Sequence, residues 1–169
     1  MAIHYHGEVE DPLNFIVVGT DHRFQENNPE LEAILQSLAR SRFIVPLRAL
    51  AEEYLQRFGA ESVAQRLANQ LQIPWFNIDM TASERSEAGI LEAQSSRPGM
   101  FQPNITYRIP SDDVREEAWV ERLVMNASGT TIVICGYLHF ESLAKKLRAR
   151  GHTVDQRVYL ETVPEIRQA

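Results

Sequence analysis

The stretch FIVVGTDHRF, residues 15–24, indicates how this chain folds. It begins with a short apolar run rich in β-branched residues, which is typical of a strand buried on both faces. The run ends at Gly19, and His22 follows three residues later. The stretch TIVICGYLHF, residues 131–140, repeats this order and places His139 at the matching position. The sequence therefore predicts two buried strands, each followed by a Gly-x-x-His motif.

The rest of the chain alternates helix patterns with strand patterns. Asn28 and Pro29 predict the start of a helix, as an N-cap and a first helical residue. Apolar periodicity predicts further helices within residues 59–74, 111–129 and 140–152, and further strands at 47–53, 75–80 and 153–161. This alternation predicts an α/β fold of three layers, in which helices cover both faces of a mainly parallel central sheet.

The length of 169 residues predicts a single α/β domain, residues 1–169, with one core. Residues 1–13 are polar and predict a surface lead-in, in which His4 and His6 belong to a polar tail. Residues 81–110 lack a clear period and contain many Ser, Pro, Gly and Asn residues. They predict an irregular segment or a lid.

Composition narrows the class of partner. The net charge of −6 disfavours nucleic acid, which is bound through clustered Lys and Arg. The sequence has no apolar window of the roughly 20 residues that span a bilayer, so we expect no membrane partner. Cys135, the single cysteine, lies in an apolar run, which predicts a buried inert thiol and favours a cytoplasmic protein. The apolar faces of the predicted helices could pack in the core or pair two subunits, so a homo-oligomer stays an open alternative.

The two histidines are the main candidates for chemistry. In open α/β sheets functional groups gather beyond the carboxyl ends of the strands, so His22 and His139 would share a pocket if their strands are neighbours. Gly19 and Gly136 are expected where the chain turns sharply or another backbone comes close. Imidazoles near a carboxylate can hold a divalent metal ion that activates water. The competing interpretation is that each histidine only caps a loop.

Two arginines are candidates for substrate binding. Arg85 follows the third predicted strand, where it could hold a carboxylate or phosphate. The alternative for Arg85 is a surface arginine paired with Glu84 or Glu87. Arg115 shares a helix face with Trp119, and the alternatives for it are a structural cluster or substrate contact.

The motifs GTDH, residues 19–22, and GYLH, residues 136–139, resemble the paired Gly-x-x-His motifs of one superfamily. It groups the erythromycin esterases, the ChaN proteins, the TraB pheromone-shutdown proteins and the Tiki proteases. The segments NIDMTASERSEAGI and REEAWVERL also resemble segments of short bacterial members. The resemblance extends over residues 15–151 and implies a hydrolase, because several members are described as metal-dependent hydrolases.

The resemblance also implies roles for particular residues. His22 and His139 would be metal ligands or proton-transfer groups, and Glu52 or Glu53 a third ligand or general base. Successive strand side chains face opposite ways, so only one glutamate should face the pocket, and we choose Glu53. The leading hypothesis is a hydrolase of an ester, amide or related bond in a small molecule or peptide, assisted by a divalent metal. The alternative is a non-catalytic ligand-binding or protein-interaction module, which the short chain favours.

Overall fold

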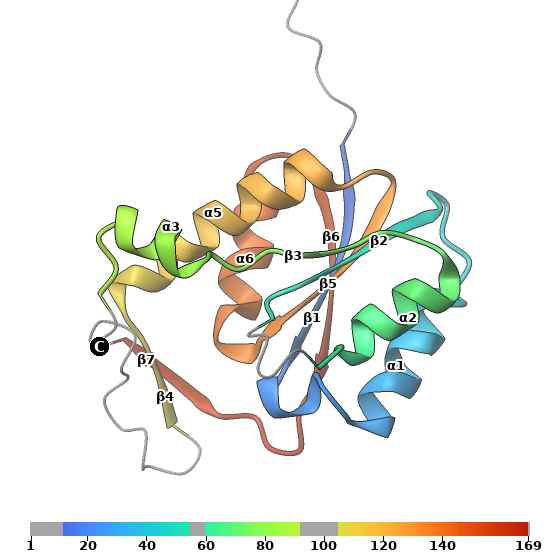
Figure 1. Cartoon of the computed structure of the whole chain (residues 1–169), viewed down its shortest axis with the longest axis horizontal. Helices are drawn as coiled ribbons and strands as arrows, with labels where there is room; N and C mark the ends of the chain where they lie inside the picture. Colours follow the sequence, from blue (N-terminus) through green and yellow to red (C-terminus); the bar gives the residue numbers. More distant parts are fainter. Residues whose placement is uncertain (1–11, 55–59, 92–104, 169) are drawn as a thin grey trace, which may run out of the picture.

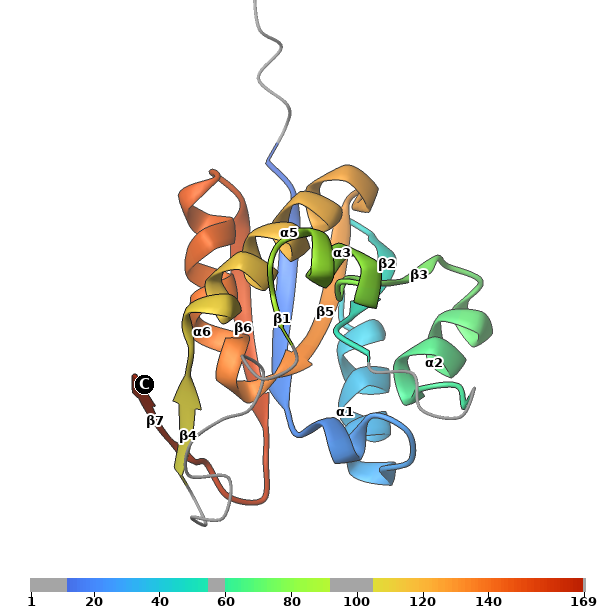
Figure 2. The ribbon, with the colours of Figure 1, turned by 60° about the vertical axis from the view of Figure 1, so that its left-hand side comes forward.

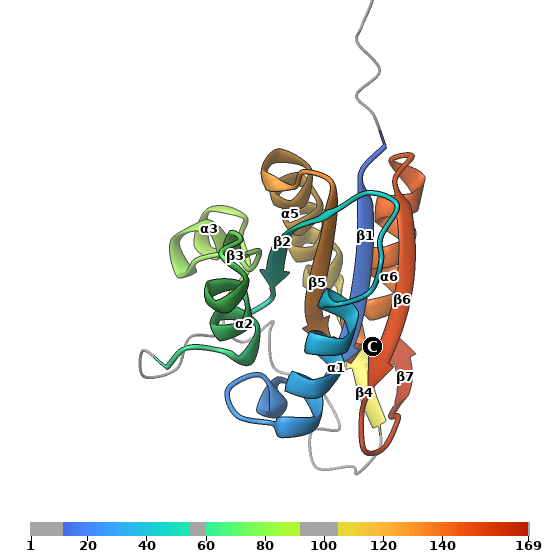
Figure 3. The same cartoon turned by 90° about the vertical axis from the view of Figure 1, so that its right-hand side faces the viewer.

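A five-stranded, fully parallel sheet forms the centre of the protein (Figure 1). The computed structural model describes residues 12–54, 60–91 and 105–168. The strands are β1 (Asn14–Thr20), β2 (Leu47–Glu52), β3 (Trp75–Asn77), β5 (Thr130–Gly136) and β6 (Thr153–Tyr159). Figure 3 shows them side by side in the order β3-β2-β5-β1-β6. The strands that carry the two Gly-x-x-His motifs, β1 and β5, are therefore direct neighbours.

Four helices cover the two faces of the sheet, which confirms the predicted three layers (Figure 1). The helices α1 (Pro29–Ala39) and α2 (Val63–Leu71) pack on one face, and α5 (Pro110–Asn126) and α6 (Tyr137–Ala149) pack on the other. Asn28 caps α1 as predicted, because its side chain accepts a hydrogen bond from the backbone of Leu31 at 2.8 Å. Ser62 caps α2 in the same way.

Burial on both faces explains the continuous apolar runs of β1 and β5. In β1, Phe15 and Val17 contact the α5–α6 layer, whereas Ile16 and Val18 contact the α1–α2 layer. Every residue of β5 is buried. The buried environment raises the pKa of the Cys135 thiol well above its usual range, in agreement with an inert thiol.

The prediction that residues 81–110 are irregular was wrong at both ends of that segment. Residues Ala82–Glu87 form the helix α3, and residues Ile105–Arg108 form the strand β4. The helix has a capping box between Thr81 and Glu84, and the sequence TASE, residues 81–84, matches the pattern of this motif. Six residues are too few to show a helical period. Residues 92–104 of the predicted lid lie outside the described residues, as do His4 and His6 of the predicted lead-in.

The strand β4 pairs in parallel with a C-terminal strand, β7 (Glu165–Gln168), which the sequence did not predict. Figure 2 shows this small second sheet apart from the main sheet, with β4 leading into α5. None of the described helices is both long and apolar enough to cross a membrane.

Candidate functional site

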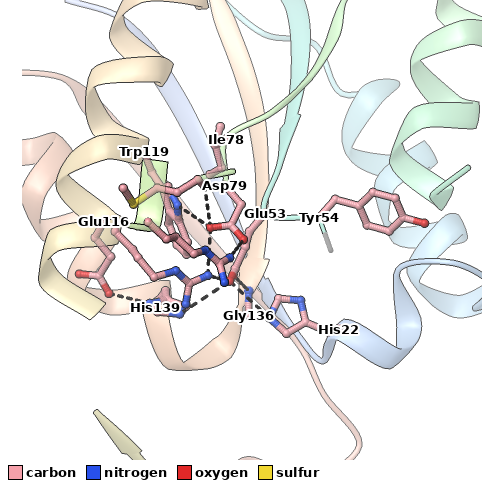
Figure 4. Close-up of polar contacts among 12 residues, drawn as sticks. His22, Glu53, Tyr54, Ile78, Asp79, Glu116, Trp119, Gly136 and His139 are labelled. Atoms are coloured by element: carbon pink, nitrogen blue, oxygen red, sulfur yellow. Dashed lines mark hydrogen bonds and ion pairs between the residues drawn. The ribbon is translucent and has the colours of Figure 1, made fainter. Parts of the chain in front are cut away.

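The structure brings His22 and His139 to the same carboxylate. His22 begins a short 3-10 helix (His22–Phe24) directly after β1, and His139 lies in the first turn of α6, directly after β5. Their Nε2 atoms lie 3.5 and 3.7 Å from Oε1 of Glu53, which directly follows β2. Figure 4 shows the two rings on either side of Gly136. The strand order thus joins three residues that are far apart in the sequence.

Glu53 is a buried carboxylate with fixed partners. Its Oε2 accepts a hydrogen bond from the Gly136 backbone at 2.9 Å, and its Oε1 accepts one from Arg115 at 2.9 Å. Burial by itself would raise the pKa of Glu53. The interaction with His139 and His22 in their protonated forms, the charge of Arg115 and the hydrogen bond from Gly136 together lower it. Glu53 is therefore an anion at the centre of the site.

Close packing explains why Gly19 and Gly136 are glycines. A Cβ atom on Gly136 would lie 2.6 Å from His22 Nε2, and one on Gly19 would lie 2.8 Å from the ring of Phe140. Neither glycine has positive φ, so the cause is a neighbouring side chain, and not the sharp turn or close backbone that the sequence suggested.

We predict that Gly136→Ala lowers any activity of this site that depends on His22 by about 10²-fold, because the added methyl group pushes His22 out of place. The backbone of Gly136, with φ −59°, suits alanine, so lack of space is the only obstacle. Activity assays on the folded variant measure the effect. Gly151→Ala is the control: it strains a residue with φ +87° but contacts nothing within 4 Å, and should keep full activity. Equal activity in both variants would contradict the prediction.

His139 is held from behind by a second carboxylate. Its Nδ1 atom lies 2.8 Å from Oε1 of Glu116 on α5. Arg108 donates to both oxygens of Glu116, at 2.7 and 3.1 Å, and Ser142 donates to Oε2. Because the carboxylate of Glu116 can only accept, Nδ1 of His139 carries hydrogen, and the lone pair of the neutral ring is on Nε2, which faces Glu53.

A third carboxylate, Asp79, lies two residues after β3 and binds three further polar side chains. Its Oδ1 accepts hydrogen bonds from Arg115 at 3.0 Å and from Trp119 at 3.2 Å, and its Oδ2 pairs with Arg85. Trp119 also packs edge-on against His139, with ring centroids 4.6 Å apart. Arg115 and Trp119 thus form a structural cluster that also borders the site.

Arg85 pairs with a carboxylate of the site and not with Glu84 or Glu87, the surface partners suggested from the sequence. It pairs with Asp79, whereas Glu84 pairs with Arg122. Asp21 accepts a hydrogen bond from the backbone of Arg23 at 2.8 Å, which is the turn interaction expected for an Asp after a strand.

An open cavity of about 460 Å³ lies over these groups. Its polar side includes His22, Glu53, Arg85, Arg115 and His139. Its apolar side is formed by Ile90, Ile109, Tyr137, Leu138 and Pro164. The side chain of His22 is 40% exposed and that of His139 is 3% exposed, so His22 stands at the mouth and His139 at the floor.

Glu52 points away from the cavity and forms a separate buried network. Its Oε2 accepts hydrogen bonds from Ser62 and from Trp75 Nε1, and its Oε1 accepts one from Gln25 at 2.9 Å. Burial raises the pKa of Glu52 to about 7, against the lowering effect of these hydrogen bonds. Of the two candidate glutamates, only Glu53 lines the cavity.

We predict that Glu52 makes the protein less stable as the pH rises. Its pKa increases on folding from 4.5 to about 7, so its stabilising effect is complete below pH 4.5 and is lost as the pH passes through 7. Roughly 3 kcal/mol of unfolding free energy should be lost over this range. Urea unfolding at several pH values measures it. Glu52→Gln should remove this part of the pH dependence, and the exposed Glu141→Gln should not. An unchanged pH slope in Glu52→Gln would contradict the prediction.

The arrangement of His22, His139 and Glu53 does not by itself form a metal site. Within residues 12–54, 60–91 and 105–168, no group of three or more His, Cys, Asp or Glu side chains is placed to hold a metal ion. In addition, the guanidinium of Arg115 occupies Glu53 Oε1, the oxygen that both imidazoles face, and its positive charge opposes a dication there. Metal binding stays a prediction, which metal analysis tests.

Several residues of the site have no recognisable signal in the sequence. Glu116 and Asp79 could be placed on a helix and at a strand end, but their contacts with His139 and Arg115 depend on the packing of α5 against the sheet. Arg108 lies in the segment predicted to be irregular, and Gln25 follows the first motif without any motif of its own.

Comparison with protein-family models, with curated proteins and with solved structures finds no match for this chain.

Proposed function

We propose that the protein is a hydrolase that cleaves an ester, amide or related bond, with His139 as general base. The observation that carries the proposal is the position of His139 between two carboxylates. Glu116 accepts from its Nδ1 at 2.8 Å, and Glu53 Oε1 lies 3.7 Å from its Nε2. A general base needs a free lone pair at the substrate cavity and negative charge that stabilises its protonated form. His139 lines the cavity, and Glu116 and Glu53 supply the negative charge.

In the proposed reaction, His139 Nε2 takes a proton from a water molecule in the cavity while the water oxygen bonds to the acyl carbon. The resulting imidazolium is stabilised by Glu116 and Glu53. His139 then gives its proton to the leaving oxygen or nitrogen as the acyl bond breaks, and the products are an acid and an alcohol or amine. These two proton transfers return His139 to its neutral form.

In this proposal, Arg85 and Arg115 stabilise the negative charge on the carbonyl oxygen. Both line the cavity, and in the part of the chain that the structure describes their buried Nε atoms have no hydrogen-bond partner. A guanidinium that is held beside the cavity by ion pairs can donate to a developing oxyanion there. The apolar wall formed by Ile90, Ile109 and Leu138 favours a substrate with an apolar acyl or leaving group.

The experiment is a hydrolysis screen with esters, anilides and short peptides of varied apolar side chains. We expect turnover of at least one ester class. Metal analysis of the purified protein, and assays with and without a chelator, test the contribution of a metal. Unchanged turnover after chelation supports the mechanism above, and loss of turnover that zinc restores supports His22, His139 and Glu53 as ligands. Saturable binding of substrates without any turnover would overturn the proposal and support a binding module.

A further inference from the structure

A buried amide, Gln25, links His22 to both glutamates. It lies just after the short helix that carries His22 and is 1% exposed. Its Oε1 lies 2.6 Å from His22 Nδ1. Its Nε2 lies 2.9 Å from Glu52 Oε1 and 2.9 Å from the backbone oxygen of Glu53. All polar atoms of the Gln25 side chain are thus engaged in one buried network.

The partners of Gln25 determine which end of the amide faces His22. The backbone oxygen of Glu53 can only accept a hydrogen bond, so the atom that faces it must be the amide nitrogen, which donates. The amide oxygen then faces His22 Nδ1 and can only accept. Nδ1 must therefore carry hydrogen, and in the neutral ring the lone pair is on Nε2.

We propose that Gln25 is a positioning residue that holds His22 in the Nδ1-protonated tautomer and thereby directs its Nε2 lone pair into the cavity. The proposal rests on the proposed function for its catalytic meaning, but the tautomer is a property of the folded protein alone. Glu52 is then a second positioning residue, because it fixes the nitrogen end of the amide and does not touch the cavity.

The role of Glu52 does not depend on its protonation state. When ionised, it accepts from Gln25, Ser62 and Trp75. When protonated, its hydroxyl can donate to Ser62 Oγ, which remains able to accept, while Oε1 still accepts from Gln25. The amide of Gln25 therefore keeps one orientation in both states, and so does the ring of His22.

This assignment gives His22 a specific task. Glu116 leaves the lone pair of His139 on Nε2, and Gln25 does the same for His22, so two lone pairs face one cavity. A water molecule can donate one hydrogen to each ring, which leaves a lone pair of its oxygen for attack on the substrate. His139 takes the proton, and His22 holds the water in the attacking orientation.

The experiment is NMR on protein with ¹⁵N-labelled histidine, since the chemical shifts of the two ring nitrogens and their couplings to ring protons distinguish the tautomers. Spectra are recorded at a pH where the His22 ring is neutral, and His22→Gln assigns the signals. We expect the Nδ1-protonated form in the wild type. An Nε2-protonated His22 would overturn the proposal, whether or not the protein hydrolyses any substrate.

The variant Gln25→Leu removes the amide at similar volume and should shift His22 toward the Nε2-protonated form that predominates in free histidine. Gln36→Leu on α1, whose side chain donates a hydrogen bond to Glu32, is the matched control and should keep the wild-type tautomer. If hydrolysis is found, kcat should fall about 10-fold to 100-fold in Gln25→Leu with little change in KM. An unchanged His22 tautomer in a folded Gln25→Leu would overturn the proposal, and if that variant does not fold, the wild-type spectrum decides.

Discussion

Replacing His139 with alanine is expected to lower kcat for hydrolysis by about 10²-fold to 10⁴-fold, the usual contribution of a general base. The variant removes the lone pair that takes the proton from water. It also leaves Glu116 with its other donors, Arg108 and Ser142, so that carboxylate stays paired. We therefore expect a folded protein with a large loss of kcat and a small change in KM. Steady-state assays with the best ester from the screen measure both constants.

His152→Ala is the matched control for His139→Ala. His152 lies before β6, at the opposite end of the sheet from the cavity, where its Nδ1 accepts a hydrogen bond from the backbone of Leu13 at 3.3 Å. This variant loses an imidazole of the same size but should retain wild-type kcat. If His139→Ala and His152→Ala both retain wild-type kcat, His139 is a structural residue and the proposed mechanism is wrong.

The variant Arg115→Met is expected to lower the free energy of unfolding by roughly 3–5 kcal/mol. Arg115 bridges Glu53 and Asp79 with distances of 2.9 and 3.0 Å. Both carboxylates are almost fully buried, with side chains 2% and 3% exposed, so solvent does little to screen their charge. Methionine fills the space of the arginine stem but removes the guanidinium from Glu53 and leaves Asp79 with Arg85 as its remaining guanidinium partner. Urea denaturation measures the loss.

A second substitution separates lost charge pairing from lost packing. In the double variant Glu53→Gln/Arg115→Met the charge that loses its guanidinium partner is absent, so its stability should be higher than the sum of the two single effects predicts. Arg148→Met, which removes an exposed arginine that donates to the backbone of Val154, should change stability by less than about 0.5 kcal/mol. Strict additivity of Glu53→Gln and Arg115→Met would show that the bridge contributes little.

The parts of the fold that could be predicted from the sequence are those with local signals. The apolar runs of β1 and β5, the Asn28–Pro29 start of α1 and the amphipathic pattern of α2 each result from a few neighbouring residues. The elements α3, β4 and β7 are short, and the pairing of β4 with β7 joins residues about 60 positions apart, so no local pattern reports it.

The candidate site was predictable only to the level of strand ends. The Gly-x-x-His motifs located His22 and His139. The alternation of strand side chains showed that only one of Glu52 and Glu53 should face the pocket, but not which one, and the structure places Glu53 there. The partners that determine their chemistry, Glu116 behind His139 and Gln25 behind His22, come from other turns and helices. Their positions depend on how α5 and the loop after β1 pack against the sheet, and the spacing of residues in the sequence does not reveal this packing.

The most direct test of the central claim, that His22 and His139 act on one water molecule in one site, is a comparison of kcat/KM for His22→Ala, His139→Ala and the double variant. Two residues that act as a unit are strongly non-additive. We predict that each single variant loses most of the activity. The kcat/KM of the double variant should be only slightly lower than that of the less active single variant. Losses that multiply in the double variant, or a single variant with wild-type activity, would contradict the account.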